Sequence, residues 1–363
     1  MIRNVCSRRT AALMALIAAI LPIAFGTSGL SVAWAAPVKL LETGSTLLYP
    51  LFNIWVPDYT HTNPDVQITT QGTGSGTGIA EATSGAAQIG ASDAYLSPAQ
   101  TAQDPTLMNI PLAISAQQIN YNLPGIGAAH LNFSGPVLAG IYSGTIKNWN
   151  DPAIAKLNPG VNLPDHEIIP VHRADGSGDT FIFTQYLSFT TPSWKEAVGF
   201  GTSVSWPAIA VGIGTNGNPG MVQALKQTPY SIAYVGISWI DQTNAAGFGY
   251  AALENRAGKF LLPTPGTIAS AAAALVGKTP PNEAISLIFA PGPNAYPIIN
   301  YEYVIVKGKQ ADPGVAAAIK AFLTWCLSPT GGGNELYLTK VHFIGLSEMV
   351  RKLSQAQVER IGQ

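Results

Sequence analysis

This chain of 363 residues has few cysteines and a small net charge. The only cysteines are Cys6 and Cys326, and Cys6 lies in a segment that we expect to be removed, so the mature chain cannot form an internal disulfide. We expect Cys326 to be a buried packing residue. Without residues 1–35 the chain has 16 Lys and Arg against 20 Asp and Glu, a formal charge of 16 − 20 = −4. A mildly acidic protein has no general attraction to nucleic acid, so we expect no nucleic-acid partner, and local donors must hold any bound anion.

Motifs for metal binding, nucleotide binding and catalysis are missing. The glycine-rich segment 72–78 contains no lysine, which excludes a P-loop, and Thr77 stands where a dinucleotide fingerprint starting at Gly72 needs glycine. Neither Ser75 nor Ser177 has glycine two positions before it, as a nucleophile elbow requires. The histidines show no metal-ligand spacing; they are His61, His130, His166, His172 and His342. We therefore expect no metal, no cofactor and no enzyme activity.

The first 35 residues have the features of a secretory signal peptide. Arg3, Arg8 and Arg9 precede an apolar run at 11–25, and Ala33-Trp34-Ala35 fits a small-x-small cleavage site before Ala36. The apolar run is shorter than the roughly 20 residues of a membrane span. We expect cleavage near Ala35 and export to a periplasm. The arginine pair leaves Sec and twin-arginine export both open, and Cys6 precedes the apolar run, so we expect no lipid anchor.

Strand-like and helix-like patterns alternate along the rest of the chain, which predicts an α/β fold. With about 328 residues left, two domains or lobes are expected. Strands are predicted at 38–42, 66–70, 88–91, 168–171, 231–239 and 296–306, and helices at 79–84, 269–276, 313–327 and 346–363. Four strand ends carry Ser, Thr, Gly, Asp or Arg. Ligands of open α/β sheets bind beyond the carboxyl ends of strands, so we expect a site there.

The segment from His172 to Phe181 is the strongest candidate for an anion site. It follows an apolar strand and precedes a helix, and its glycines allow a tight turn. The first N–H groups of a helix have no internal partner, and the helix dipole favours an anion there. Arg173 adds a planar fork of donors that suits a tetrahedral oxyanion. The alternative is an ordinary helix start, with Ser177 or Asp179 as the cap and Arg173 solvated.

Together these loops resemble the phosphate-binding protein of bacterial phosphate ABC transporters, the PstS family. The resemblance covers nearly all of the mature chain. It rests on Gly44-Ser45-Thr46, on Gly-x-Gly-Ser-x-x-Gly around Ser75, on Gly90-Ala91-Ser92-Asp93, on residues 141–149, on Arg173-Ala174-Asp175-Gly176-Ser177-Gly178 and on Tyr296-Pro297-Ile298. It implies that the protein binds inorganic phosphate and delivers it to the membrane permease subunits of an ABC transporter.

The resemblance also implies which residues hold the anion. Thr46 and Leu47, in the loop with Ser45, and Ser75 would donate from one lobe, and Asp93 would accept a proton from phosphate. Arg173, Ser177 and Gly178 would donate from the other lobe. The family often has Thr where this chain has Asp179. The N–H of Asp179 can still donate, but its carboxylate must either pair with Arg173 or accept a second phosphate proton.

The implied fold is a type II periplasmic-binding-protein fold with two lobes, each a mixed sheet flanked by helices. We expect lobe I to contain residues 36–115 and 300–363 and lobe II residues 116–299, with hinge strands near 114–119 and 298–303. We expect a monomer. The alternatives are a carrier for another tetrahedral oxyanion such as sulfate, an exported phosphatase or serine hydrolase, and an adhesive or signalling protein that has lost the ligand.

Overall fold

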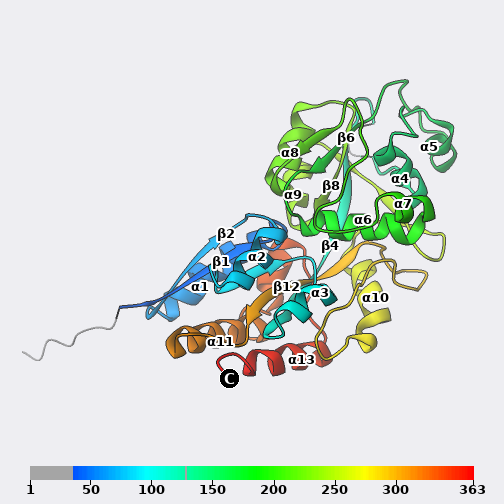
Figure 1. Ribbon diagram of the computed structural model, residues 1–363. Coiled ribbons are helices and arrows are strands. Elements are labelled where there is room, and N and C mark those ends of the chain that lie inside the picture. Colours follow the sequence, from blue (N-terminus) through cyan, green and yellow to red (C-terminus); the bar gives the residue numbers. More distant parts are fainter. Residues whose placement is uncertain (1–35, 127–128) are drawn as a thin grey trace, which may run out of the picture. The chain divides into compact units, whose positions relative to one another are not determined.

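The main sheet contains nine strands, some parallel and some antiparallel to their neighbours (Figure 1). The computed structural model describes residues 36–126 and 129–363, and the predicted signal peptide, residues 1–35, lies outside them. The strand order is β2-β1-β3-β12-β4-β8-β6-β7, and β9 also pairs with β4. The strands are β1 (Val38–Gly44), β2 (Val66–Gln71), β3 (Ile89–Ser92), β4 (Leu107–Asn122), β6 (Ile169–Arg173), β7 (Ile213–Thr215), β8 (Ser231–Gly236), β9 (Gly249–Tyr250) and β12 (Ile299–Lys307).

Helices flank this sheet, and a second, three-stranded sheet has the order β11-β10-β5. Its strands are β5 (Asn132–Phe133), β10 (Ala252–Glu254) and β11 (Phe260–Leu261). The helices are α1 (Tyr49–Thr62), α2 (Ser75–Ser84), α3 (Pro98–Gln103), α4 (Gly135–Ser143), α5 (Pro152–Leu157), α6 (Gly178–Thr190), α7 (Pro192–Ala197), α8 (Gly217–Gln227), α9 (Ile240–Ala245), α10 (Pro265–Leu275), α11 (Pro313–Leu327), α12 (Glu335–Leu338) and α13 (Glu348–Glu359). This mixed arrangement confirms the predicted α/β class.

The long strand β4 joins two halves of the main sheet. From Leu107 to Ala116 it pairs antiparallel with β12, and from Gln117 to Asn122 it pairs antiparallel with β8. We call β2, β1, β3, β12 and the first part of β4 the first half-sheet, and the second part of β4 with β8, β6, β7 and β9 the second half-sheet. All residues of β4 except the last are buried, although its sequence includes polar residues such as Asn109, Gln117 and Gln118, so the strand shows neither a continuous apolar run nor a clean alternation. The sequence pattern did not reveal this strand as one element.

Helix α2 begins earlier than its sequence pattern predicts. We expected a helix from residue 79, but it starts at Ser75. Gly74 has a φ of 95°, which glycine adopts without strain, so the chain turns directly into the helix. Gly78 approaches β1 so closely that a Cβ would lie 2.8 Å from the Thr43 carbonyl oxygen. Glycines therefore form part of the first helical turn. Because glycine has a low helix propensity, the sequence did not indicate that the helix begins there.

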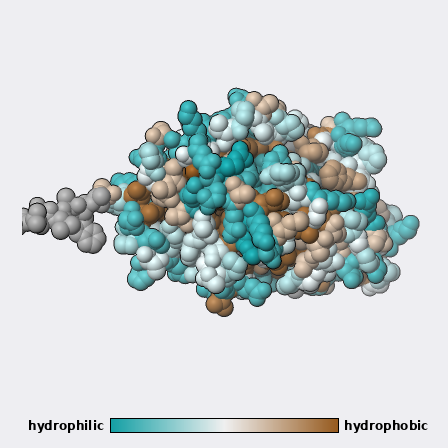
Figure 2. Space-filling view, turned by 90° about the horizontal axis from the view of Figure 1, so that it is seen from below, coloured by the Kyte–Doolittle hydropathy of each residue, from teal (hydrophilic) through white to brown (hydrophobic). Residues whose placement is uncertain are grey.

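The core is dense and rich in aromatic side chains. Trp55 packs edge-on against Trp325, and Phe322 stacks on the same ring of Trp325. Cys326 beside it is buried and unbonded, as predicted, and burial raises the pKa of its thiol. Figure 2 shows one face of the unit formed by residues 37–363, where hydrophilic side chains predominate and hydrophobic ones are scattered. Of the helices within residues 36–126 and 129–363, none has the length and apolar character needed to cross a bilayer.

Candidate anion-binding site

The predicted site residues come from four separate parts of the chain, and the structure brings them together. Ser45 and Thr46 follow β1, and Asp93 follows β3. Because β1 and β3 are parallel neighbours, their carboxyl ends lie side by side. Ser75 is the first residue of α2, and Arg173 is the last residue of β6. Each of these five residues is at most 3% exposed.

Asp93 is a buried carboxyl group held by two hydroxyls. Ser45 Oγ donates to its Oδ1, and Ser75 Oγ lies 3.3 Å from its Oδ2. The Asp93 backbone N–H in turn donates to Ser75 Oγ at 3.1 Å. Burial, and after it the like charge of Asp179, raises the pKa of Asp93 to about 7, although hydrogen bonds with Ser45 and Glu302 oppose the rise. Asp93 is therefore an acceptor whose charge changes close to neutral pH.

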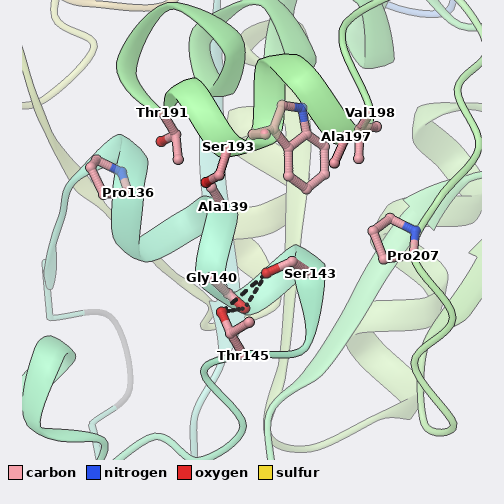
Figure 3. Close-up of a pocket in the computed structure, with 11 residues that line it drawn as sticks. Pro136, Ala139, Gly140, Ser143, Thr145, Thr191, Ser193, Ala197, Val198 and Pro207 are labelled. Carbon is pink, nitrogen blue, oxygen red and sulfur yellow. Dashed lines mark hydrogen bonds between the residues drawn. The ribbon is translucent and has the colours of Figure 1, made fainter.

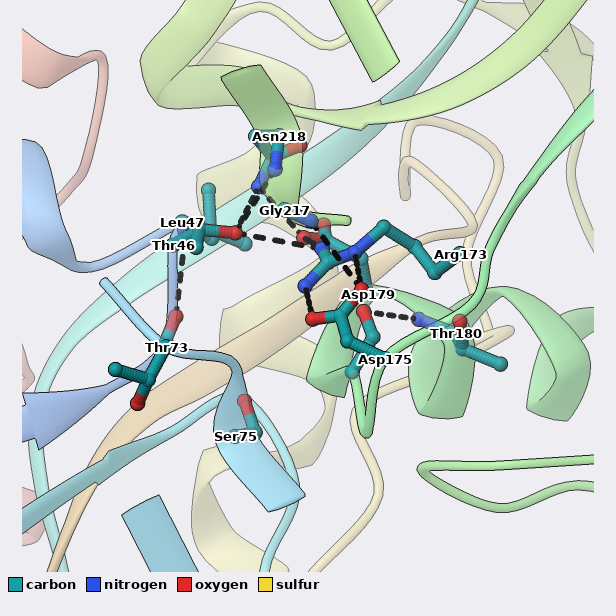
Figure 4. A network of polar contacts seen from close by, with 12 residues as sticks. Thr46, Leu47, Thr73, Ser75, Arg173, Asp175, Asp179, Thr180, Gly217 and Asn218 are labelled. Carbon is teal, nitrogen blue, oxygen red and sulfur yellow. Dashed lines mark hydrogen bonds and ion pairs between the residues drawn. The ribbon is translucent and has the colours of Figure 1, made fainter. Parts of the chain in front are cut away.

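Arg173 is clamped by acidic side chains on two sides (Figure 4). Its Nε donates to Asp175 Oδ1 at 2.6 Å, and its Nη2 donates to the other oxygen of the same carboxylate. Its Nη1 lies 3.1 Å from Asp179 Oδ2 and 3.3 Å from Thr46 Oγ1. Burial raises the pKa of Asp175, but the hydrogen bonds and the charge of Arg173 outweigh burial and hold that pKa below its usual value. The guanidinium is therefore ionised and fixed in one orientation.

The alternative of a solvated Arg173 is wrong, because this residue is 2% exposed. A guanidinium has five N–H groups, and the four contacts above engage four of them. The fifth, on Nη2, has no acceptor within residues 36–126 and 129–363 beyond the Asp175 contact already made by that nitrogen's other N–H. Arg173 can thus offer at least one charged donor without breaking its pairing with Asp175 and Asp179.

Asp179 pairs with Arg173, which is one of the two roles that the sequence left open for its carboxylate. Its Oδ2 also accepts from Asn218 Nδ2 at 2.7 Å, and its Oδ1 accepts from Gln117 Nε2 at 3.0 Å. Burial raises its pKa above the usual value, and the charge of Arg173 is the largest opposing effect. The carboxylate is thus fully engaged by donors from β6, α8 and β4.

Sequence reasoning missed Asn218 and Gln117. Asn218 lies at the start of α8, shortly after the end of β7, so it belongs to a further strand–loop–helix unit like those already found. Its backbone N–H and its Nδ2 both donate to Thr46 Oγ1, at 3.0 and 3.1 Å. Gln117 lies inside β4 next to Gln118 and Asn120, where one amide among several gives no sequence signal.

The N-terminus of α6 points donors into this cluster. Ser177 caps the helix, and its Oγ accepts from the Thr180 N–H at 3.1 Å, so the predicted capping role is present. The N–H groups of Gly178 and Asp179 donate to no protein atom among residues 36–126 and 129–363. Gly178 lies against Asp93, and a Cβ at this position would be 2.5 Å from the Asp93 Cβ. Unpaired backbone donors at the start of α6 therefore lie next to the acidic acceptor Asp93.

The loop after β1 differs in one detail from the implied site. The N–H groups of Leu47 and Leu48 donate to Ser45 Oγ, at 3.1 and 3.0 Å. The N–H of Thr46 has no protein acceptor in the described part of the chain. In this structure Thr46, rather than Leu47, holds the open backbone donor of this loop.

Several hydrogen bonds link elements of the first half-sheet to elements of the second. Gly76 N–H donates to the Gly176 carbonyl at 2.8 Å, and Trp239 Nε1 donates to the Thr46 carbonyl at 3.0 Å. The Asn218 bonds to Thr46 Oγ1 belong to the same set. The cluster is therefore closed on both sides by direct contacts.

A separate pocket of about 290 Å³ lies between α4, α7 and Pro207 (Figure 3). Its lining is Pro136, Ala139, Gly140, Ser143, Thr145, Thr191, Ser193, Trp194, Ala197, Val198 and Pro207. None of these side chains is charged, and the pocket contains none of the predicted site residues. The chemistry suited to an anion lies at the strand ends, not in this pocket.

Comparison with known proteins agrees with this geometry. The family model described as a PBP superfamily domain matches residues 31–330. The chain is 38% identical to the phosphate-binding protein PstS of Methanocaldococcus jannaschii, across 89% of this chain and 86% of that one. It is 34% identical to the PstS of Pasteurella multocida, across 94% of each chain.

Solved structures show the same fold. A high-affinity periplasmic phosphate-binding protein called PfluDING, bound with phosphate, gives a TM-score of 0.70 at 20% identity and covers 88% of this chain and 93% of its own. The phosphate-binding protein of Stenotrophomonas maltophilia gives 0.68 at 19% identity, with 89% and 94% covered. These likenesses confirm the predicted type II periplasmic-binding-protein fold. The chain therefore belongs to the PstS family of phosphate-binding proteins, within the PBP superfamily.

Proposed function

We propose that this protein binds inorganic phosphate and delivers it to the membrane subunits of an ABC-type phosphate permease. One observation carries the proposal: the buried acceptor Asp93 lies against Gly178 at the start of α6, whose N–H groups are open, and Arg173 is buried in the same cluster. A site with both donors and an acceptor suits an anion that still carries a proton. The names of the relatives above support the same ligand.

The proposed site has nine residues, which share a position at a strand end or a helix start. The open donors are the N–H groups of Thr46, Gly178 and Asp179 and the free Nη2 N–H of Arg173. The hydroxyls of Ser45 and Ser75 and the N–H of Leu47 bond within the protein in this structure and would turn to the ligand, while Asp93 accepts the phosphate proton. Asp179 acts by orienting Arg173. The residues are Ser45, Thr46, Leu47, Ser75, Asp93, Arg173, Ser177, Gly178 and Asp179.

The donors come from two half-sheets, so we propose that phosphate closes two lobes on each other. Lobe I would contain residues 36–115 and 300–363, and lobe II residues 116–299, with β4 and β12 as the hinge. Within the proposed lobe II, residues near 279–285 bond to the first half-sheet: Thr279 Oγ1 lies 3.0 Å from Tyr301 Oη, and Tyr303 Oη donates to the Glu283 carbonyl at 3.0 Å. We assign this short segment to lobe I.

We further propose that the protein is exported, works as a monomer in the periplasm and does not catalyse a reaction. The membership of a family of binding proteins supports the last point. Turnover of a phosphomonoester by the purified protein would instead favour a phosphatase.

The test of the proposed function is calorimetry with phosphate and with sulfate at neutral pH. Phosphate then keeps one or two protons and sulfate keeps none, so only phosphate can donate to Asp93. A site built around a ligand hydroxyl can reject an analogue without it by about 10⁴- to 10⁵-fold. We expect phosphate binding to survive roughly a thousandfold excess of sulfate. Displacement by sulfate at comparable concentration would favour a general oxyanion carrier.

A further inference from the structure

A second buried carboxyl group, that of Glu302, lies directly behind Asp93. Strand β12 pairs antiparallel with β3, and Tyr303 is opposite Ser92, so Glu302 and Asp93 are on adjoining chain segments. The side chain of Asn300 reaches across to the Asp93 carbonyl, with Nδ2 3.5 Å from the oxygen. The β4–β12 pairing shifts register between Glu302 and Tyr303. Glu302 has no exposed surface, so only protein groups can satisfy its carboxyl.

The two oxygens of Glu302 have different surroundings. Oε1 accepts from Ser115 Oγ and from Asn300 Nδ2, the latter at 3.1 Å. Oε2 receives no N–H or O–H donor from residues 36–126 and 129–363. Continuing the β3–β12 register by one residue places Glu302 opposite Asp93, and such cross-strand partners have Cβ atoms about 4.5–5.5 Å apart, close enough for the two carboxyls to meet. Two carboxyls can form a hydrogen bond only when one of them carries a proton.

The surroundings of the pair indicate which carboxyl carries this proton. Ionised groups that face Asp93 are Arg173 from β6 and Asp179 from α6, and Ser45 and Ser75 donate to it. Glu302 forms no salt bridge with any Lys, Arg or His of residues 36–126 and 129–363. Burial, and after it the charge of Asp93, raises the pKa of Glu302 well above its usual range, whereas that of Asp93 rises only to about 7. The proton therefore resides on Glu302 in the neutral range.

We propose that Glu302 is a positioning residue for ligand selectivity: its neutral carboxyl donates a hydrogen bond to Asp93 and so keeps Asp93 an ionised acceptor for a ligand hydroxyl. This inference rests on the proposed function, because it assigns the selectivity of the same site. Without the donor, buried Asp93 takes up a proton itself. A protonated Asp93 donates to any tetrahedral oxyanion and no longer requires a ligand proton.

Two substitutions of similar volume separate this role from simple packing. In Glu302→Gln the amide oxygen can accept from Ser115 and Asn300, and the amide Nε2–H replaces the carboxyl O–H as the donor to Asp93, so the donor is preserved. In Glu302→Met the volume is preserved and the donor is lost. A purely structural role would make both variants behave alike or would affect only stability.

The experiment measures phosphate and sulfate affinity by calorimetry at several pH values for the wild type and both variants. We expect Glu302→Gln to keep the wild-type ratio of the two affinities. We expect Glu302→Met to reduce this ratio at least about tenfold at neutral pH, since each unit of upward pKa shift in Asp93 changes its ionisation ratio tenfold. The pH below which phosphate binding weakens should also rise in Glu302→Met. An unchanged ratio and pH profile in Glu302→Met, or equal losses in both variants, would overturn the proposal.

Infrared spectroscopy tests the proton on Glu302 independently of any ligand and does not require Glu302→Met to fold. The difference spectrum between wild type and Glu302→Gln at neutral pH should contain the C=O stretch of one neutral carboxyl. Its absence would show that Glu302 is ionised and would refute the proposal. If wild-type protein binds no phosphate while this band is present, the proposed function fails and the proton on Glu302 stands.

Discussion

Replacement of Arg173 by lysine should strongly weaken phosphate binding while preserving the fold. The guanidinium engages four N–H groups with Asp175, Asp179 and Thr46 and has one left for a ligand. A lysine ammonium has only three donors, and the carboxylates of Asp175 and Asp179 compete for them. Disruption of a desolvated charged hydrogen bond costs about 2–5 kcal/mol, which corresponds to a loss of affinity of about 30- to 4,000-fold.

Lysine is the more informative replacement because it keeps the positive charge between the two carboxylates. In Arg173→Ala, Asp175 and Asp179 are left partly buried without a cation, and the removal of one partner of a buried ion pair costs about 3–5 kcal/mol of stability. We expect Arg173→Ala to lose both phosphate binding and thermal stability, and Arg173→Lys to lose mainly binding.

The assay is calorimetry with phosphate, combined with thermal denaturation of the same samples. The exposed Arg256 offers a matched control, since Arg256→Lys makes the same chemical change away from the site. We expect the control to bind phosphate as the wild type does. Near wild-type affinity in both Arg173 variants would remove Arg173 from the binding site and refute the reasoning above.

Three further predictions follow from the geometry. Phosphate should reduce the radius of gyration measured by small-angle scattering, because the donors come from two half-sheets; an unchanged radius with binding confirmed would count against closure. Gly178→Ala should abolish phosphate binding, since its Cβ would lie 2.5 Å from the Asp93 Cβ, whereas Gly266→Ala, which meets no atom within 4 Å, should bind normally in the same calorimetric assay. Burial raises the pKa of Glu283 to about 8, so its contribution to stability is complete below the usual 4.5 and is lost as the pH rises through about 8. Urea denaturation should therefore show stability falling over this range in the wild type and falling less in Glu283→Gln, with the exposed Glu196→Gln as control; equal slopes in all three proteins would contradict the assignment.

The strand ends of the site could be predicted from the sequence because each belongs to a local strand–loop–helix unit. Hydroxyl, glycine and acidic residues between an apolar strand and a helix are visible within about ten positions, as around Ser45, Ser75 and Ser177. The start of α2 was predicted too late because its first turn consists of Ser, Thr and Gly, which have no apolar periodicity. Local patterns thus identified residues that the fold gathers into one cluster, but not the limits of the helices beside them.

The residues that were missed act through contacts distant in sequence. Gln117 and Asn218 reach Asp179 from positions 62 and 39 residues away, and Ser115 reaches Glu302 across 187 residues. A polar residue within a buried strand, such as Gln117 or Glu302, gives no local sign of what it faces. Only the pairing of β4 with β12 and β8 reveals these partners.

The charge balance of the proposed site gives a physical account of the selectivity that we propose for this mildly acidic protein. Arg173 faces three carboxylates, those of Asp93, Asp175 and Asp179, so formal charge alone does not attract a ligand. The attraction must come from uncharged donors, above all the open N–H groups at the start of α6, whose direction the fold fixes. Such donors fit any tetrahedral oxyanion, whereas Asp93 accepts only from one that carries a proton. In the proposed site Asp93 therefore adds a requirement for a ligand hydroxyl to donors that would otherwise bind any tetrahedral oxyanion. The same carboxylates cancel the positive charge of Arg173, which a less selective site would use to attract the anion.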